Sequence, residues 1–104
     1  MPLPNLPDEA AMSLNADGTV VYQRGCTGAK SSTGVYTCTL PSPGIAAAEA
    51  EVMCQMIGAA WGFIRVAHTS DTVKTISTVN IDGTTAADKA FNLSIKRRAV
   101  GSVY

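Results

Sequence analysis

The sequence predicts an all-β fold, an antiparallel β-sandwich or small barrel of about six to eight short strands. Short segments rich in Val, Ile, Thr and aromatic residues alternate apolar with polar side chains. Alternation with a period of two gives a strand one buried face and one solvated face. Clusters of Gly, Pro, Asn and Asp separate these segments at regular intervals, as turns do between strands.

Residues 1–14 are predicted to form an extended, proline-rich arm, and residues 15–104 to form the sandwich domain. Proline fixes φ and lacks an amide donor, which favours extended or polyproline-like chain. Leucines in such a segment are exposed unless they lie on another surface. Two interpretations stay open: a disordered tail, or an arm that docks on a neighbouring subunit. The prolines are Pro2, Pro4 and Pro7, and the leucines are Leu3 and Leu6.

The first half of the chain is expected to hold two strands. The turn signal Asn15–Gly18 precedes the β-favouring run Thr19–Tyr22, and residues 24–34, rich in glycine and hydroxyl side chains, are expected to be a loop. The strand Val35–Leu40 follows and ends at a Pro-Ser-Pro-Gly stretch. Its alternation places Tyr36, Cys38 and Leu40 on one face and Val35, Thr37 and Thr39 on the other.

Residues 45–60 leave helix and strand open. Alanine, glutamate and methionine are good helix formers, yet apolar and polar side chains also alternate from residue 52 onward. As a helix, the apolar stripe would be Ile45, Ala48, Val52 and Met56; as a strand, Val52, Cys54 and Met56 would lie opposite Met53, Gln55 and Ile57.

Three further strands are expected over residues 61–68, 72–81 and 90–97. A turn at Thr69–Asp71 ends the first of them, and Asp82-Gly83 begins the loop after the second. The last strand alternates most clearly, so one of its faces is expected to be buried. Its apolar face is Phe91, Leu93 and Ile95.

Composition limits the classes of partner. The 104 residues correspond to one domain, and their eight basic and eight acidic side chains cancel. A neutral chain favours protein surfaces over nucleic acid as partners. No apolar run is long enough to span a membrane, and the N-terminus lacks a secretory signal. The three cysteines, an odd number, favour synthesis in a reducing cytoplasm over a disulfide framework.

No constellation of residues predicts catalysis, a metal site or a cofactor. His68 is the only histidine and is expected to be structural or solvent-facing. The cysteines form no Cys-x-x-Cys pair; Cys38 and Cys54 lie in apolar alternations typical of buried thiols, whereas the position of Cys26 in a glycine-rich loop leaves its exposure open. A bridge between Cys26 and Cys38 stays open. The basic cluster Lys96–Arg98 is expected to be a solvated strand end or a contact to an acidic partner.

Four segments of the chain together resemble small β-sandwich domains of bacteriophage tail fibres, head fibres and capsid decoration proteins. STGVYTCTL is similar to the Gly-Val-Tyr-x-x-Thr strand that recurs in those domains, and DGTVVYQRG to the strand and loop before it. GFIRVAHTSD and ISTVNIDGTTAADKAFNLSIKR resemble the later strands. The resemblance covers residues 17–98. It implies a jelly-roll-like sandwich, often trimeric, that works by binding, and it favours a strand from about residue 50.

The resemblance leads to the expectation of a non-enzymatic virion protein, made in the bacterial host cytoplasm. A single short chain without coiled-coil heptads favours a capsid decoration, or cement, protein that binds the major capsid protein and sister subunits. Its expected contact residues are Leu3, Leu6, Arg97 and Arg98. The alternative is a receptor-binding tip or knob of a tail or head fibre, with Trp61 and Tyr104 facing the receptor. A third hypothesis is a small enzyme with Cys26 or Cys54 as nucleophile.

Overall fold

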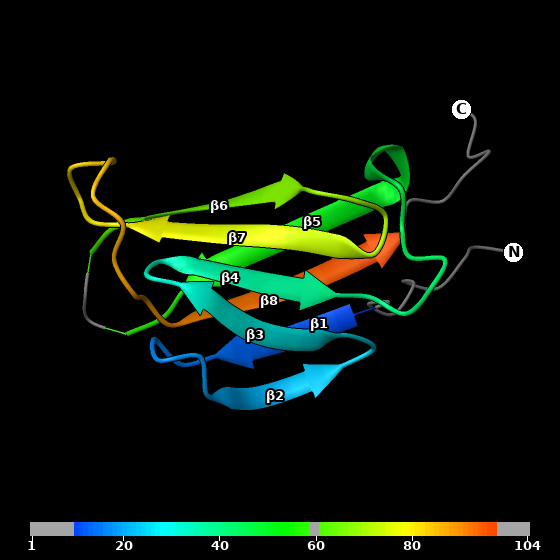
Figure 1. The fold of residues 1–104 in the computed structure, drawn as a ribbon, viewed down its shortest axis with the longest axis horizontal. Coiled ribbons are helices and arrows are strands. Elements are labelled where there is room, and N and C mark those ends of the chain that lie inside the picture. The colour runs from blue at the N-terminus through cyan, green and yellow to red at the C-terminus, as the bar shows by residue number, and fades with distance from the viewer. Residues whose placement is uncertain (1–9, 59–60, 98–104) are drawn as a thin grey trace, which may run out of the picture.

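Two four-stranded antiparallel sheets pack face to face in the structure, a computed structural model that describes residues 10–58 and 61–97 (Figure 1). The prediction of an all-β antiparallel sandwich is confirmed. The first sheet has the strand order β2-β1-β8-β5 and the second β3-β4-β7-β6. The elements are β1 (Ala10–Leu14), β2 (Val20–Arg24), β3 (Thr27–Ser32), β4 (Val35–Thr39), the 3₁₀ turn η1 (Ala47–Glu49), β5 (Ala50–Met56), β6 (Phe63–His68), β7 (Val73–Val79) and β8 (Phe91–Arg97).

The core lies between the sheets and is built by strands that alternate in burial. At its centre the rings of Tyr36 and Phe91 meet edge to face, with centroids 4.9 Å apart. The predicted inner faces of β4 and β8 are confirmed, because their alternate apolar residues are buried. The buried apolar residues are Ala10, Met12, Leu14, Cys26, Tyr36, Cys38, Leu40, Ile45, Ile76, Phe91, Leu93 and Ile95.

Two segments differ from the sequence-based expectation. Residues 10–14, assigned to the arm, form the inner strand β1, which pairs with both β2 and β8. Residues 27–32, assigned to a loop, form the edge strand β3. Backbone pairing with β4 holds β3 in place, and Gly28 faces the other sheet. A Cβ on Gly28 would lie 2.8 Å from Met12 Sδ, so glycine makes room there for a core side chain.

The open segment from residue 45 is resolved in favour of a strand. After η1, β5 runs from Ala50 and pairs antiparallel with β8. Val52 and Cys54 pack against the core, whereas Met53 between them is 67% exposed. The expected turn after β7 is also present, because the Asp82 carboxylate accepts hydrogen bonds from the backbone amides of Thr84 and Thr85.

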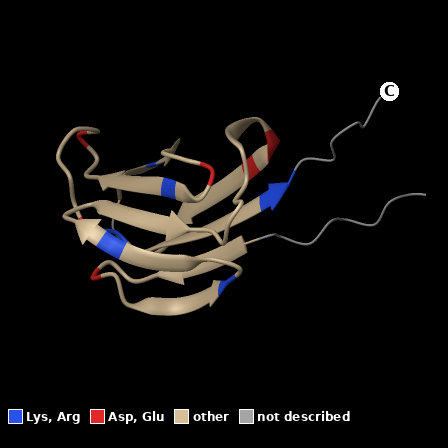
Figure 2. Cartoon of the chain, turned by 45° about the vertical axis from the view of Figure 1, so that its right-hand side comes forward, with Lys and Arg blue, Asp and Glu red and all other residues tan. Residues whose placement is uncertain are grey.

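The two ends of the sandwich carry different connections. β1 begins and β8 ends at the same end as the β6–β7 turn, while the loop between β7 and β8 lies at the opposite end (Figure 1). Charged residues are spread over the sandwich rather than gathered into one block of either sign (Figure 2). Among the described residues, no helix has the length and apolar character that a membrane crossing requires.

Candidate functional site

The outward face of the first sheet holds a groove of about 360 Å³. Strand register explains its shape, because two rows of side chains cross all four strands. Small residues occupy the middle strands, while larger ones stand on the edge strands. One row is Tyr22, Ser13, Asn92 and Gln55, and the other is Arg24, Ala11, Ser94 and Met53.

The groove is polar at its floor and apolar at its sides. Ser13, Ser94 and Asn92 supply hydroxyl and amide groups, and no carboxylate, lysine or arginine lines it. Tyr22 on β2 is 50% exposed and Met53 on β5 is 67% exposed, so both present apolar surface to an incoming molecule. Arg24 Nε donates a hydrogen bond of 3.0 Å to the Tyr22 hydroxyl, which orients the ring. This arrangement suits an uncharged ligand with hydrogen-bond acceptors.

A second surface, here named the apolar tip, consists of Trp61, Phe63 and Ile81. These side chains are 80%, 56% and 71% exposed. Phe63 pairs with Val79 in the β6–β7 ladder, Trp61 lies two residues before Phe63, and Ile81 lies in the turn that follows Val79. The apolar tip therefore lies at the end of the sandwich opposite the start of β1 (Figure 1).

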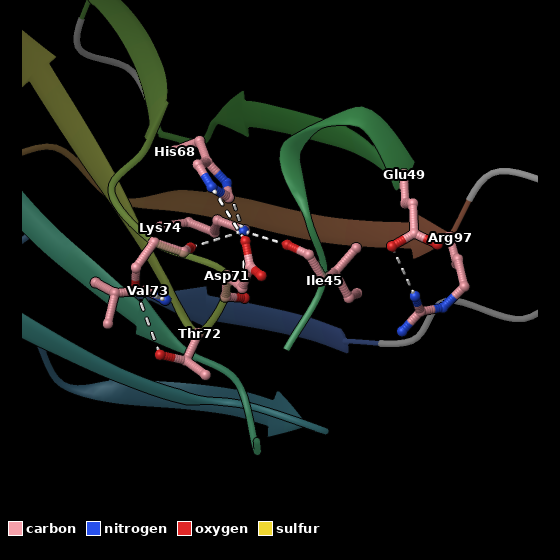
Figure 3. A network of polar contacts seen from close by, with 9 residues as sticks. Ile45, Glu49, His68, Asp71, Thr72, Val73, Lys74 and Arg97 are labelled. Carbon is pink, nitrogen blue, oxygen red and sulfur yellow. Dashed lines mark hydrogen bonds and ion pairs between the residues drawn. The ribbon is translucent and has the colours of Figure 1, made fainter. Parts of the chain in front are cut away.

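A polar network lies at the other end of the sandwich, around the buried side chain of Lys74 (Figure 3). Lys74 exposes only 1% of its surface. Its ammonium donates to the carbonyl oxygens of Ile45, Ser70 and Asp71 at 2.6, 3.0 and 3.3 Å. Nδ1 of His68 accepts at 2.8 Å. The network ties the β6–β7 turn to the connection between β4 and β5.

Burial lowers the pKa of the Lys74 ammonium from its ordinary value, and the nearby Asp71 carboxylate opposes that shift. The ammonium is surrounded by acceptors and shielded from solvent, so a substrate has no access to it. The same contacts engage the His68 ring. This cluster is therefore suited to holding the fold together rather than to proton transfer with a ligand.

The thiols of Cys26 and Cys38 contact each other inside the core. Cys26, in the bend between β2 and β3, is only 9% exposed and belongs to the core, so the exposed loop thiol that the sequence left open is not found. The Cys26 thiol also lies 3.6 Å from the Ala11 carbonyl oxygen. Its hydrogen bond with Cys38 lowers the Cys26 pKa to about 7, while the same contact and burial raise the pKa of Cys38. The thiols of Cys26, Cys38 and Cys54 are free.

Of the six partner-binding residues expected from the sequence, two lie in the described part of the chain. Arg97, at the end of β8, forms an ion pair with Glu49 at 3.4 Å and donates to the Gly44 carbonyl oxygen. Trp61 is in the apolar tip, two residues before β6, and β6 begins at the end of the sandwich opposite the end of β8 (Figure 1). The others, Leu3, Leu6, Arg98 and Tyr104, lie outside the described residues.

Sequence reasoning did not single out Tyr22, Met53, Phe63 or Lys74. Tyr22, Met53 and Phe63 lie on strands whose sequences do not show which face packs against the other sheet and which face is exposed to solvent. Lys74 did carry a signal, because the alternation places it on the same face of its strand as Ile76, and that face is buried. A lysine on an apolar strand face indicates a buried ammonium that needs acceptors.

Among residues 10–58 and 61–97, no group of three or more His, Cys, Asp or Glu side chains is placed to hold a metal ion. Comparison of the chain with family models, curated proteins and solved structures finds no match.

Proposed function

We propose that the protein is a non-enzymatic structural protein of a bacteriophage virion, a decoration protein that binds the outer surface of the capsid. The observation that carries this proposal is the apolar tip, where Trp61, Phe63 and Ile81 are each more than half exposed. Large apolar side chains exposed near one end of a small domain are candidates for an interaction site. The resemblance of residues 17–98 to phage sandwich domains supports the choice of the major capsid protein as partner.

The polar groups of the described residues support binding rather than catalysis. His68 and Lys74 are engaged with each other and with backbone carbonyls. Cys26, the thiol with the lowered pKa, lies in the core beside Cys38 rather than in a groove. We therefore propose no cofactor, and we propose protein partners, the capsid and sister copies, rather than nucleic acid or membrane. The zero formal net charge agrees with protein partners.

A second candidate function, the receptor-binding tip of a fibre, is favoured by one specific observation. The apolar tip contains two exposed aromatic rings, Trp61 and Phe63, at the end of the sandwich away from the start of β1. Exposed rings stack on sugar faces as well as on protein surfaces. We propose the apolar tip as the binding surface in either case, although the sequence assigned the capsid contact to Leu3, Leu6, Arg97 and Arg98 and the receptor contact to Trp61 and Tyr104.

Capsid binding tests the proposal. Capsids lacking the protein are mixed with the full chain and with the double variant W61A/F63A, and bound protein is measured by co-sedimentation. We expect the wild type to saturate the capsids and the double variant to lose affinity by about tenfold or more. The matched control is Val21→Ala, an apolar residue of similar exposure on the other sheet, which is expected to bind capsids as the wild type does.

Binding to host-cell glycans with no affinity for capsids would replace the decoration function with the fibre-tip function. Equal capsid binding by wild type and W61A/F63A would remove the apolar tip from the mechanism. Circular dichroism of each variant separates a lost contact from a lost fold.

A further inference from the structure

We infer that residues 2–7, PLPNLP, of one copy of the chain bind in the groove of a second copy. This contact joins copies of the protein, so it stands whether or not the apolar tip binds a capsid. The groove is the hollow on the outward face of the first sheet, between Tyr22 on β2 and Met53 on β5. The sequence alone leaves open where a proline-rich arm would dock, and the groove supplies a surface of matching chemistry.

The hydrogen-bonding groups of the two surfaces are complementary. Three of the six residues in PLPNLP are proline, which has a carbonyl acceptor but no amide donor. The groove presents the hydroxyls of Ser13 and Ser94 and the side-chain amides of Asn92 and Gln55, each of which can donate a hydrogen bond. The carbonyl acceptors of the segment would thus find donors on this surface.

The apolar groups match as well. Proline-rich segments recurrently dock in grooves lined by aromatic side chains, because the polyproline helix is extended before binding and loses little entropy. Tyr22 supplies an exposed ring held by Arg24, and Met53 supplies a flexible thioether at the opposite side. The rings of Pro2, Pro4 and Pro7 and the side chains of Leu3 and Leu6 are the apolar groups that would contact them.

The dimensions agree with this placement. Six residues in a polyproline helix extend about 19 Å. Crossing the sheet from its first strand to its fourth takes about 14 Å, since neighbouring strands lie about 4.8 Å apart. Residues 2–7 are therefore long enough to lie across all four strands, from Tyr22 to Gln55.

The position of β1 favours a second copy over the same chain. Nine residues precede Ala10, where β1 begins, and β1 then runs under the groove. A segment that continued the line of β1 backward would point away from its own groove. Reaching its own groove would require a reversal within the short link Asp8-Glu9, whereas the groove of an adjacent copy requires none. The acidic link would also lie near Arg24, a basic side chain beside the groove.

Photo-crosslinking in the full-length chain tests the inference directly. A benzophenone amino acid replaces Leu3, and this protein is mixed with ¹⁵N-labelled wild type before irradiation. We expect crosslinks from position 3 to labelled peptides that contain Tyr22 or Met53. Crosslinks confined to the same unlabelled chain, or crosslinks to other surfaces alone, would overturn the inference, as would a chain that stays monomeric at every concentration.

Complementary variants give an independent measurement by sedimentation. L3D/L6D disables the segment and Tyr22→Ala disables the groove, and each is expected to weaken self-association by about tenfold or more. Val21→Ala, the matched control at an exposed apolar residue of β2 that does not line the groove, is expected to associate as the wild type does. A mixture of L3D/L6D with Tyr22→Ala restores one intact segment and one intact groove, so we expect mixed dimers. Failure of this mixture to associate, with both variants folded by circular dichroism, would refute the contact.

Discussion

Nζ of Lys74 lies 2.8 Å from Nδ1 of His68, across the turn that joins β6 to β7. An ammonium group only donates hydrogen bonds, so Nδ1 accepts and the proton of the neutral ring resides on Nε2. Nε2 faces the Asp71 carboxylate at 3.5 Å. One buried cation thereby sets the tautomer of the only histidine and fixes three backbone carbonyls, which makes this end of the sandwich a single hydrogen-bonded unit.

Replacing Lys74 with methionine tests that role. Methionine keeps most of the side-chain volume but leaves the buried carbonyl of Ile45 without a donor, while the carbonyls of Ser70 and Asp71 keep the backbone amides of Val73 and Ile45. We expect the free energy of unfolding to fall by about 1–3 kcal/mol, the cost of leaving one buried acceptor unsatisfied. Urea unfolding followed by circular dichroism measures the change.

The control for this substitution is Lys30→Met. Lys30 forms an ion pair with Asp88 at 2.7 Å, but on the exposed surface of β3. Its loss is expected to change the free energy of unfolding much less than the loss of Lys74. Equal losses for the two variants would show that the buried network does not stabilise the fold as described.

A second prediction concerns Tyr36, whose hydroxyl donates a hydrogen bond of 2.7 Å to the Ala16 carbonyl oxygen in the β1–β2 turn. Tyr36→Phe keeps the edge contact with Phe91 and removes the hydroxyl that makes this bond. We expect a loss of about 1–2 kcal/mol in the free energy of unfolding, measured in urea. Tyr22→Phe removes a hydroxyl from the exposed strand β2 and should cost less; a larger loss for Tyr22→Phe would contradict the assignment.

Strands with strict apolar alternation were predictable from the sequence alone. In β8 every second residue from Phe91 to Ile95 is large and apolar, so the period of two fixes both the strand and its buried face. The same holds for β4, where Tyr36 and Cys38 point inward. For these segments the local pattern and the tertiary burial agree, and no long-range information is needed.

The edge strand β3 was not predictable in this way. Its sequence, TGAKSS, has no large apolar side chain, and its only buried residue is Gly28. Two long-range features define β3: its backbone pairing with β4, and the space that Gly28 leaves for the side chain of Met12 on β1. Neither can be recognised in the sequence of β3 by itself. The groove has the same origin, because register across four strands brings Tyr22 and Met53 to opposite sides of one hollow.

Thiol reactivity gives a third prediction. The Cys38 thiol lowers the Cys26 pKa to about 7, whereas burial raises the pKa of Cys54. At neutral pH we expect iodoacetamide to alkylate Cys26 faster than Cys54, although Cys26 is the more buried, because the thiolate is the reacting form. Peptide mass spectrometry measures both rates.

The control is Cys38→Ala, which removes the hydrogen bond and should slow the alkylation of Cys26 severalfold. An unchanged rate would show that access of the reagent, and not ionisation of the thiol, controls the alkylation of Cys26.

The dependence of stability on acid pH gives the last prediction. Hydrogen bonds from Thr85 and then Thr84 lower the pKa of the Asp82 carboxyl from 3.8 to about 2. Because the unfolded chain binds the proton more tightly, the contribution of Asp82 to stability is fully present above pH 3.8 and is lost as the pH falls toward 2.

Asp82→Asn keeps one acceptor oxygen for the amides of Thr84 and Thr85 but has no proton to gain. Urea unfolding of both proteins at several pH values should therefore give curves that lie apart at neutral pH and converge toward pH 2. Curves that stay parallel throughout would show that the loop after β7 does not hold the ionised carboxylate preferentially.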